Sequence, residues 1–262
     1  MRFIKINFHI VFITLLSCNQ NDDTNQFHYN VFGKGQPTIV IEAAMGDDSE
    51  SWEDIQAKLS HFATVVTYDR LGLGKSQSTT MPRTVANFAN DLDEFLTTEN
   101  ISPPYILMGH SLGGFIIRKY QNDHPEKVVG MILVDPLHEY QYEMLMAIKT
   151  KADQEKTKSE VQEFYQNQPL GVQNEFKEYH YNCQVMQKLP FAMDLPITII
   201  ASLMVNESVT KEERLVKKEL FENWKKDAPQ IKTIYTTKSG HYIQDTEPEL
   251  ILDAVKSMIK SY

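Results

Sequence analysis

The sequence predicts an α/β fold, in which a mostly parallel central sheet carries helices on both faces. Apolar runs of strand length recur along the chain and alternate with longer segments that have the periodicity of amphipathic helices. Strands that are separated by helices pair in parallel, because each helix supplies the crossover between its neighbours. The chain has 262 residues, 42% of them hydrophobic, and this length and composition can bury one large core.

The expected strands cover residues 38–41, 64–68, 104–108, 128–134, 197–200 and 231–235. The expected helices cover residues 51–62, 82–96, 111–124, 210–226 and 248–259. Residues 136–195 interrupt the alternation with a helical insert that is rich in methionine and aromatic residues. Such side chains suit a cavity for apolar ligands, and they equally suit the packing faces of two amphipathic helices.

A glycine-flanked serine stands between an expected strand and an expected helix, in the sequence Gly109-His110-Ser111-Leu112-Gly113. A sharp turn there strains the backbone of the serine and leaves room only for small residues two positions before and two after it. The turn would lift the Ser111 hydroxyl above the sheet and aim a helix N-terminus at an oxyanion beside it. Ser111 is therefore the candidate nucleophile, and its alternative role is that of a helix N-cap.

Further landmarks accompany this turn in a fixed order. They are residues 39–46 with Trp52 after them, residues 68–76, the turn itself, and residues 239–241 ahead of the last helix. Through these landmarks, residues 27–262 resemble the α/β-hydrolase family, in which the nucleophile precedes a histidine along the chain. The resemblance implies a fold with a helical cap inserted at residues 136–195.

The resemblance also implies the chemistry of the site. His241 is expected to be the general base, since an imidazole changes its protonation state near neutral pH. The main-chain amides of Met45 and Leu112 are expected to form the oxyanion hole. His110, beside the nucleophile, is expected to pack or to hydrogen-bond rather than to transfer a proton.

The acid of the expected triad has two main candidates. Most members of the family place it after the strand expected at residues 197–200, where Glu207 is available. Some place it after the preceding strand, where Asp135 stands about two dozen residues beyond Ser111, at the edge where parallel sheets keep functional groups. Asp135 is favoured, although Asp-Pro is also a common helix cap. Glu139 and Asp194 are further candidates.

Asp69 and Arg70, followed by Gly72 and Gly74, resemble a catalytic motif at first sight. We expect them to form a structural ion pair and a tight loop near the site instead.

These features predict a serine hydrolase that cleaves carboxylic esters of small, apolar acyl substrates without a cofactor or a metal. Amide or thioester hydrolysis needs the same machinery. The alternative is a binding or sensing protein that keeps the fold and has lost efficient chemistry, because residues 43–44 are Ala-Ala where many members have His-Gly. The net charge of −9 argues against a nucleic-acid partner.

The N-terminal residues predict export. A basic start, an apolar stretch and the sequence Leu15-Leu16-Ser17-Cys18 resemble a bacterial lipoprotein signal, and the stretch is too short to span a bilayer. The resemblance implies a signal peptide at residues 1–17, a lipid on Cys18, and a polar tether at residues 18–26. The protein is then expected in the bacterial cell envelope, held to a membrane by that lipid. The alternative is an ordinary cleaved signal peptide.

Overall fold

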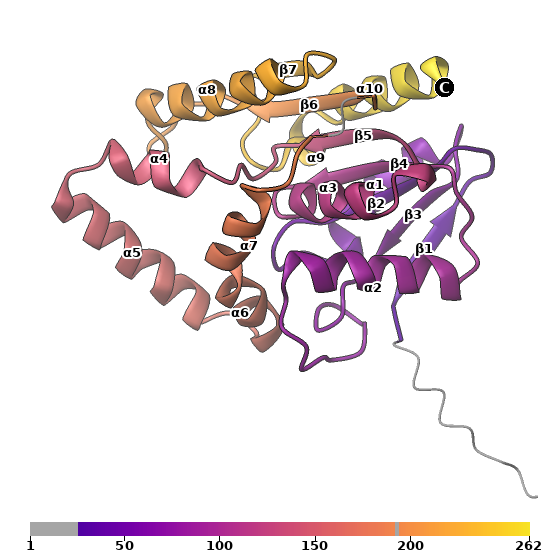
Figure 1. Cartoon of the computed structure of the whole chain (residues 1–262), viewed down its shortest axis with the longest axis horizontal. Helices are drawn as coiled ribbons and strands as arrows, with labels where there is room; N and C mark the ends of the chain where they lie inside the picture. Colours follow the sequence, from indigo (N-terminus) through magenta and orange to yellow (C-terminus); the bar gives the residue numbers. More distant parts are fainter. Residues whose placement is uncertain (1–25, 192–193) are drawn as a thin grey trace, which may run out of the picture.

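The computed structural model describes residues 26–191 and 194–262, and Figure 1 shows their arrangement. A seven-stranded sheet forms the centre, in the spatial order β1-β3-β2-β4-β5-β6-β7. The strands are β1 (Tyr29–Phe32), β2 (Thr38–Glu42), β3 (Val65–Tyr68), β4 (Tyr105–His110), β5 (Val128–Val134), β6 (Ile197–Ser202) and β7 (Lys232–Thr236). The predicted fold class is therefore confirmed, with β1 as an additional strand.

All neighbouring strands except one pair run parallel. β1 pairs antiparallel with β3, and Tyr29 lies opposite Tyr68. Every residue of β2, β3 and β4 is buried, as expected for strands that are covered on both faces. The carboxyl ends of β2, β4, β5, β6 and β7 thus meet at one edge of the sheet.

Helices cover both faces of this sheet. The helices and short 3-10 turns outside the insert are η1 (Ser49–Trp52), α1 (Glu53–Leu59), α2 (Val85–Thr98), α3 (Gly113–Asp123), η2 (Pro125–Lys127), α8 (Lys211–Asp227), α9 (Ile243–Thr246) and α10 (Pro248–Ser261). Val40 joins the apolar cluster built with α2, α3 and α8, whereas its neighbours Ile39 and Ile41 join the cluster built with α1 and α10. This alternation follows from the two-residue period of a strand.

Residues between β5 and β6 form a separate helical layer. It consists of α4 (Gln141–Ala147), α5 (Lys151–Gln166), α6 (Leu170–Lys177) and α7 (Tyr179–Met186). Several of its aromatic rings pack on one another: the rings of Tyr165 and Phe176 stack with centroids 3.9 Å apart, and Phe176 also contacts Tyr179. These aromatic residues therefore tie α5, α6 and α7 together.

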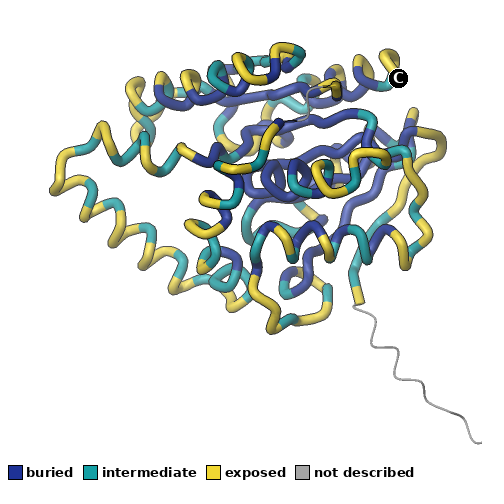
Figure 2. Tube along the Cα trace, in the orientation of Figure 1, coloured by how far each residue is buried: buried dark blue, intermediate teal, exposed yellow. Residues whose placement is uncertain are grey.

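The two halves of the insert differ in how they meet the core. On α6, a Cβ added at Gly171 would lie 2.0 Å from the carbonyl oxygen of Gly72, so this helix is seated directly on a core loop. Met186 of α7 is fully buried beside Leu112. By contrast, α5 buries none of its residues, and Figure 2 shows it as a rod of exposed and half-buried positions.

No helix in the described ranges combines the length and the apolar character that crossing a membrane requires. The predicted signal peptide, Cys18 and nearly all of the predicted tether lie outside the described residues.

Candidate active site

Ser111 occupies a sharp turn between β4 and α3. Its φ is +53°, in the left-handed region that costs energy for a residue with a side chain. Its amide donates to the carbonyl oxygen of Val134 (3.1 Å), and its own carbonyl oxygen accepts from the amides of Gly114 and Leu137. The turn is thus fastened to the end of β5, and the serine stands at the carboxyl edge of the sheet.

The glycines on either side of Ser111 are required by space. A Cβ at Gly109 would lie 2.5 Å from the carbonyl oxygen of Gly113, and a Cβ at Gly113 would lie 2.3 Å from the carbonyl oxygen of Glu42. Neither contact can be relieved by moving a side chain, because both partners are backbone atoms. The positions of these two glycines in the sequence therefore reflect the close approach of β4, α3 and the end of β2.

His241 and Asp135 come together at the same edge. The Nδ1 of His241, in the loop after β7, lies 2.7 Å from Oδ2 of Asp135 at the end of β5. The other oxygen, Oδ1, accepts from the amide of Ser202 (2.7 Å) and from Nζ of Lys217 (2.6 Å). Burial raises the pKa of Asp135, but the charge of Lys217 and the bond from His241 outweigh it, so the pKa lies well below its ordinary value.

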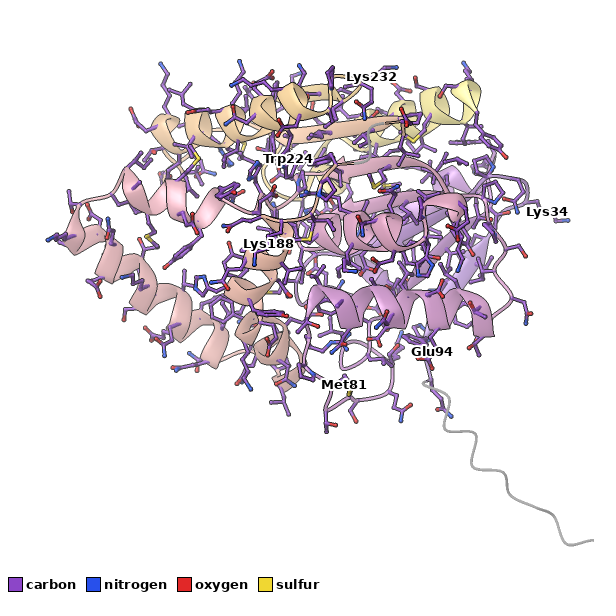
Figure 3. The ribbon with its side chains drawn as sticks, in the orientation of Figure 1. Lys34, Met81, Glu94, Lys188, Trp224 and Lys232 are labelled. Atoms are coloured by element: carbon purple, nitrogen blue, oxygen red, sulfur yellow. The ribbon has the colours of Figure 1, made fainter. Side chains whose placement is uncertain are left out.

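The other acidic candidates lie elsewhere. Glu207 is exposed in a turn closed by the bridge between Asn206 and Val209. Glu139 accepts hydrogen bonds from Arg118 and from the indole of Trp224, and Asp194 is exposed. Figure 3 shows Trp224 pointing inward from α8. Of these four carboxylates, Asp135 is the one that hydrogen-bonds to His241.

His110 holds the loop that carries His241. Its Nε2 donates to the carbonyl oxygen of His241 at 2.9 Å, and the two rings have centroids 4.5 Å apart. Burial, helped by the nearby His241, lowers the pKa of His110 to about 3. His110 therefore stays neutral near pH 7 and holds the position of the loop.

The loop after β2 carries Met45, and Arg70 holds that loop in place. The guanidinium of Arg70 donates to the carbonyl oxygens of Ala43 (2.8 Å) and Ala44 (2.6 Å). Within the described part of the chain, the amides of Met45 and Leu112 donate to no hydrogen bond. Two main-chain donors are thus left free at the places where the sequence predicts them.

Arg70 takes its ionic partners from outside its own loop. It pairs with Glu42 at the end of β2 and with Glu175 of α6, each at 2.7 Å. Burial lowers the pKa of Arg70, but the two carboxylates raise it above its ordinary value. The neighbouring Asp69 accepts instead from the amides of Ser49 and Lys75, so it closes the tight loop without pairing with Arg70.

Sequence reasoning missed two of these groups, Lys217 and Glu175. Lys217 stands on the apolar face of α8, with Leu220, Phe221 and Trp224 at helical spacing after it, and all four are buried. A lysine that interrupts an apolar face was the available signal. Glu175 follows polar neighbours on a short helix, and no local pattern distinguishes it.

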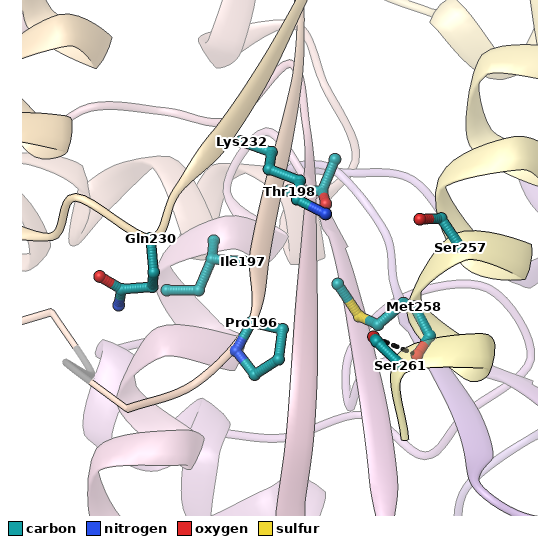
Figure 4. A pocket seen from close by; sticks show the side chains of 8 residues that line it. All are labelled: Pro196, Ile197, Thr198, Gln230, Lys232, Ser257, Met258 and Ser261. Atoms are coloured by element: carbon teal, nitrogen blue, oxygen red, sulfur yellow. Dashed lines mark hydrogen bonds between the residues drawn. The ribbon is translucent and has the colours of Figure 1, made fainter.

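A small cavity lies at the opposite edge of the sheet. It has a volume of about 30 Å³ and is lined by the starts of β6 and β7 and the end of α10 (Figure 4). Such a volume has room for water but not for an acyl substrate. In residues 26–191 and 194–262, no group of three or more histidine, cysteine and acidic side chains could hold a metal ion.

Comparison with curated sequences finds partial relatives. A Bacillus subtilis protein described as "Uncharacterized protein YqjL" is 34% identical over 104 residues, which cover 40% of this chain and 41% of that protein. A (lyso)-N-acylphosphatidylethanolamine lipase from Mus musculus is 36% identical over 107 residues, which cover 39% of this chain and 31% of the lipase. The chain thus aligns with less than half the length of these relatives.

Solved structures match over nearly the whole chain. An esterase from Thermogutta terrifontis superposes with a TM-score of 0.61 at 17% identity, over 90% of this chain and 94% of the esterase. The enol-lactonase from Burkholderia xenovorans gives a TM-score of 0.64 at 15% identity, over 91% of this chain and 98% of the lactonase. At these identities the likeness concerns the fold. A family model described as "alpha/beta hydrolase fold" matches residues 37–175, more than half of the chain. The protein belongs to the α/β-hydrolase family.

Proposed function

We propose that the protein is a serine hydrolase that cleaves carboxylic esters through an acyl-enzyme on Ser111. The observation that carries the proposal is the hydrogen bond between His241 and Asp135, at the edge of the sheet where Ser111 stands. A carboxylate on Nδ1 fixes the tautomer of the imidazole and leaves Nε2 free to take a proton. Carboxylate, imidazole and hydroxyl then form a triad.

The proposed reaction has two halves. In the first, His241 takes the proton of Ser111 while the serine oxygen attacks the ester carbonyl carbon, and the oxyanion is stabilised by the amides of Met45 and Leu112. Collapse of this intermediate breaks the bond to the alcohol, which leaves with the proton from His241. In the second half, His241 activates water, which attacks the acyl-enzyme and releases the carboxylic acid and Ser111.

Support for an ester substrate comes from two sides. The similar proteins include one named an esterase and one named a lipase. The helical insert adds an apolar side chain near the nucleophile, since the half-buried Tyr179 packs against the cluster that contains Leu112. Such surroundings favour an apolar acyl group over a charged one. Amides and thioesters are tested as competing substrates.

The test is covalent labelling together with turnover. The wild-type protein should react with a fluorophosphonate probe and hydrolyse members of a panel of acyl esters. Ser111→Ala should lose labelling and at least a thousandfold of turnover, since removal of a triad member leaves only binding and oxyanion effects. Ser102→Ala is the matched control, because Ser102 is exposed and lies just before β4, at the end of the strand away from Ser111.

Labelling of Ser111→Ala at the wild-type rate would refute the proposal. A wild-type protein that neither labels nor turns over any ester, amide or thioester, yet binds an acyl ligand, would favour the binding or sensing alternative.

We also propose that the protein is exported and anchored to a bacterial membrane through a lipid on Cys18. The supporting feature is the lipoprotein-like sequence that ends at Cys18.

A further inference from the structure

Lys217 is a buried cation at the back of the proposed triad. It extends from α8, and its Nζ lies 2.6 Å from Oδ1 of Asp135, with both side chains buried. The opposite oxygen of the same carboxylate holds His241. The carboxylate that holds the imidazole thus has an ammonium group bonded on its other side. Burial lowers the pKa of Lys217, and the Asp135 carboxylate opposes this effect.

The hydrogen bonds leave Asp135 little freedom to rotate. Oδ1 is held by the ammonium of Lys217 and by the amide of Ser202, and Oδ2 is held by His241. The backbone of Asp135 is itself constrained, with φ at +39° and its amide bonded to the carbonyl oxygen of Ile200. Lys217 is therefore one of the groups that fix which carboxylate oxygen faces the histidine.

The charge of Lys217 also acts on the histidine. An imidazolium is stabilised by a neighbouring carboxylate, and a cation bonded to that carboxylate offsets part of this stabilisation. The titratable and charged groups that face His241 or its partner come from several elements. They are Asp135 from the end of β5, His110 from β4, Asp47 and Tyr242 from adjoining loops, and Lys217 and Arg214 from α8.

Within this group, Lys217 is the cation in direct contact with the triad acid. Tyr242 is bonded to Asp47 at 3.4 Å, and Arg214 donates to the carbonyl oxygen of Met204. His110 stays neutral because burial lowers its pKa to about 3. Removal of the positive charge at position 217 should therefore move the midpoint of the acid limb of kcat/KM in one direction, toward higher pH.

We propose that Lys217 is a positioning residue of the triad: it fixes Asp135 toward His241 and, through its charge, keeps the imidazole free of a proton at lower pH. This inference rests on the proposed hydrolase function. It adds a specific role, since Lys217 touches neither substrate nor nucleophile in the proposed reaction and acts only through Asp135.

The experiment compares variants of Lys217 by the pH dependence of kcat/KM. Lys217→Met removes the charge at similar size, and it should move the midpoint of the acid limb to higher pH by about one unit, as expected for loss of one nearby charge. Lys217→Gln removes the charge and keeps a donor for Asp135, so it should show the same direction. Lys217→Arg keeps the charge and should restore the wild-type midpoint.

Lys218→Met is the matched control, because Lys218 is the exposed neighbour on α8 and faces the ring of Tyr235. It loses the same charge one residue away and should leave the midpoint unchanged. Unfolding temperatures of all variants distinguish a loss of folding from a change in the pH dependence of kcat/KM.

A second readout does not depend on turnover. Proton uptake by His241, followed by NMR of histidine-labelled protein, should shift in Lys217→Met and Lys217→Gln as the acid limb does. If no ester is hydrolysed, the titration still tests the charge effect, so failure of the proposed function is distinguishable from failure of this inference. Wild-type midpoints in both neutral variants, with only the unfolding temperature lowered, would overturn the inference and leave Lys217 a structural ion-pair partner.

Discussion

Arg70 of the core and Glu175 of the insert form a buried, doubly bonded ion pair, with Nε–Oε1 at 2.7 Å and Nη2–Oε2 at 3.0 Å. The same Glu175 carboxylate accepts from the amide of Gly46, and Arg70 holds the carbonyl oxygens of Ala43 and Ala44. One side chain of the insert thus takes part in fixing the loop that presents the amide of Met45.

We predict that Glu175→Ala lowers the free energy of unfolding by about 3 kcal/mol, because the buried Arg70 loses one of its two carboxylate partners and keeps only Glu42, and the amide of Gly46 loses its acceptor. Turnover should also fall through kcat more than through KM, since the loop of the proposed oxyanion hole loses an anchor. Urea unfolding and steady-state kinetics measure the two effects. Glu163→Ala, on the exposed side of α5, should change neither; equal effects of both variants would contradict the prediction.

We predict that Asp135→Asn is far more damaging than Glu207→Gln. Loss of the carboxylate that holds the imidazole can cost about ten-thousandfold in turnover, whereas Glu207 is exposed in a turn. The measurement is kcat/KM for both variants at one pH, with unfolding temperatures as a check on folding. A larger loss in Glu207→Gln would show that the acid has been assigned to the wrong strand.

We predict that His138 weakens the fold as the pH falls. Its ring stacks on Trp224 with centroids 4.3 Å apart, and burial, aided by the charge of Arg118, lowers its pKa to about 4. Between pH 6.5 and 4 the unfolded chain therefore binds a proton that the folded protein excludes, so the free energy of unfolding falls with pH by up to about 1.4 kcal/mol per unit.

His138→Phe keeps a stacked ring and removes this proton. Relative to wild type, the variant should gain stability as the pH is lowered from 6.5 to 4.5, and urea unfolding at several pH values measures the difference. A constant difference across that range would mean that His138 takes up its proton equally in both states.

We predict that Cys18 carries the membrane anchor. Expressed in a bacterium, the wild-type protein should incorporate labelled fatty acid and partition into detergent, because a lipid on its sulfur adds apolar surface. Cys18→Ser should do neither. Cys183→Ser makes the same exchange at a buried position of the insert and should behave like wild type. An unprocessed wild-type chain that begins at Met1 would exclude the lipoprotein hypothesis.

Local patterns predicted the parts of this protein that short-range sterics determine. The turn at Ser111 needs glycine at positions 109 and 113 because backbone atoms occupy the space of a side chain there, and that need is visible in five residues. The main parallel strands could also be predicted, because each is a run of apolar residues that becomes buried. The order of the landmarks, rather than any single motif, pointed to His241.

The ionic partners of Asp135 and Arg70, which are Lys217 and Glu175, could not be predicted from the sequence. Lys217 is 82 residues from Asp135 and Glu175 is 105 residues from Arg70, so no local period connects the partners. The four residues of β1 were missed because the strand is short and Asn30 interrupts its apolar residues. Their strand exists through its antiparallel pairing with β3.

The outer helix α5 buries none of its residues, whereas α6 is seated on the core loop around Gly72. Changes in α5 therefore carry little folding penalty, while changes in α6 disturb the loop that serves the proposed oxyanion hole. The two helices of one insert should therefore differ in how many substitutions they tolerate, and solvent-facing positions of α5 can be exchanged without loss of the fold.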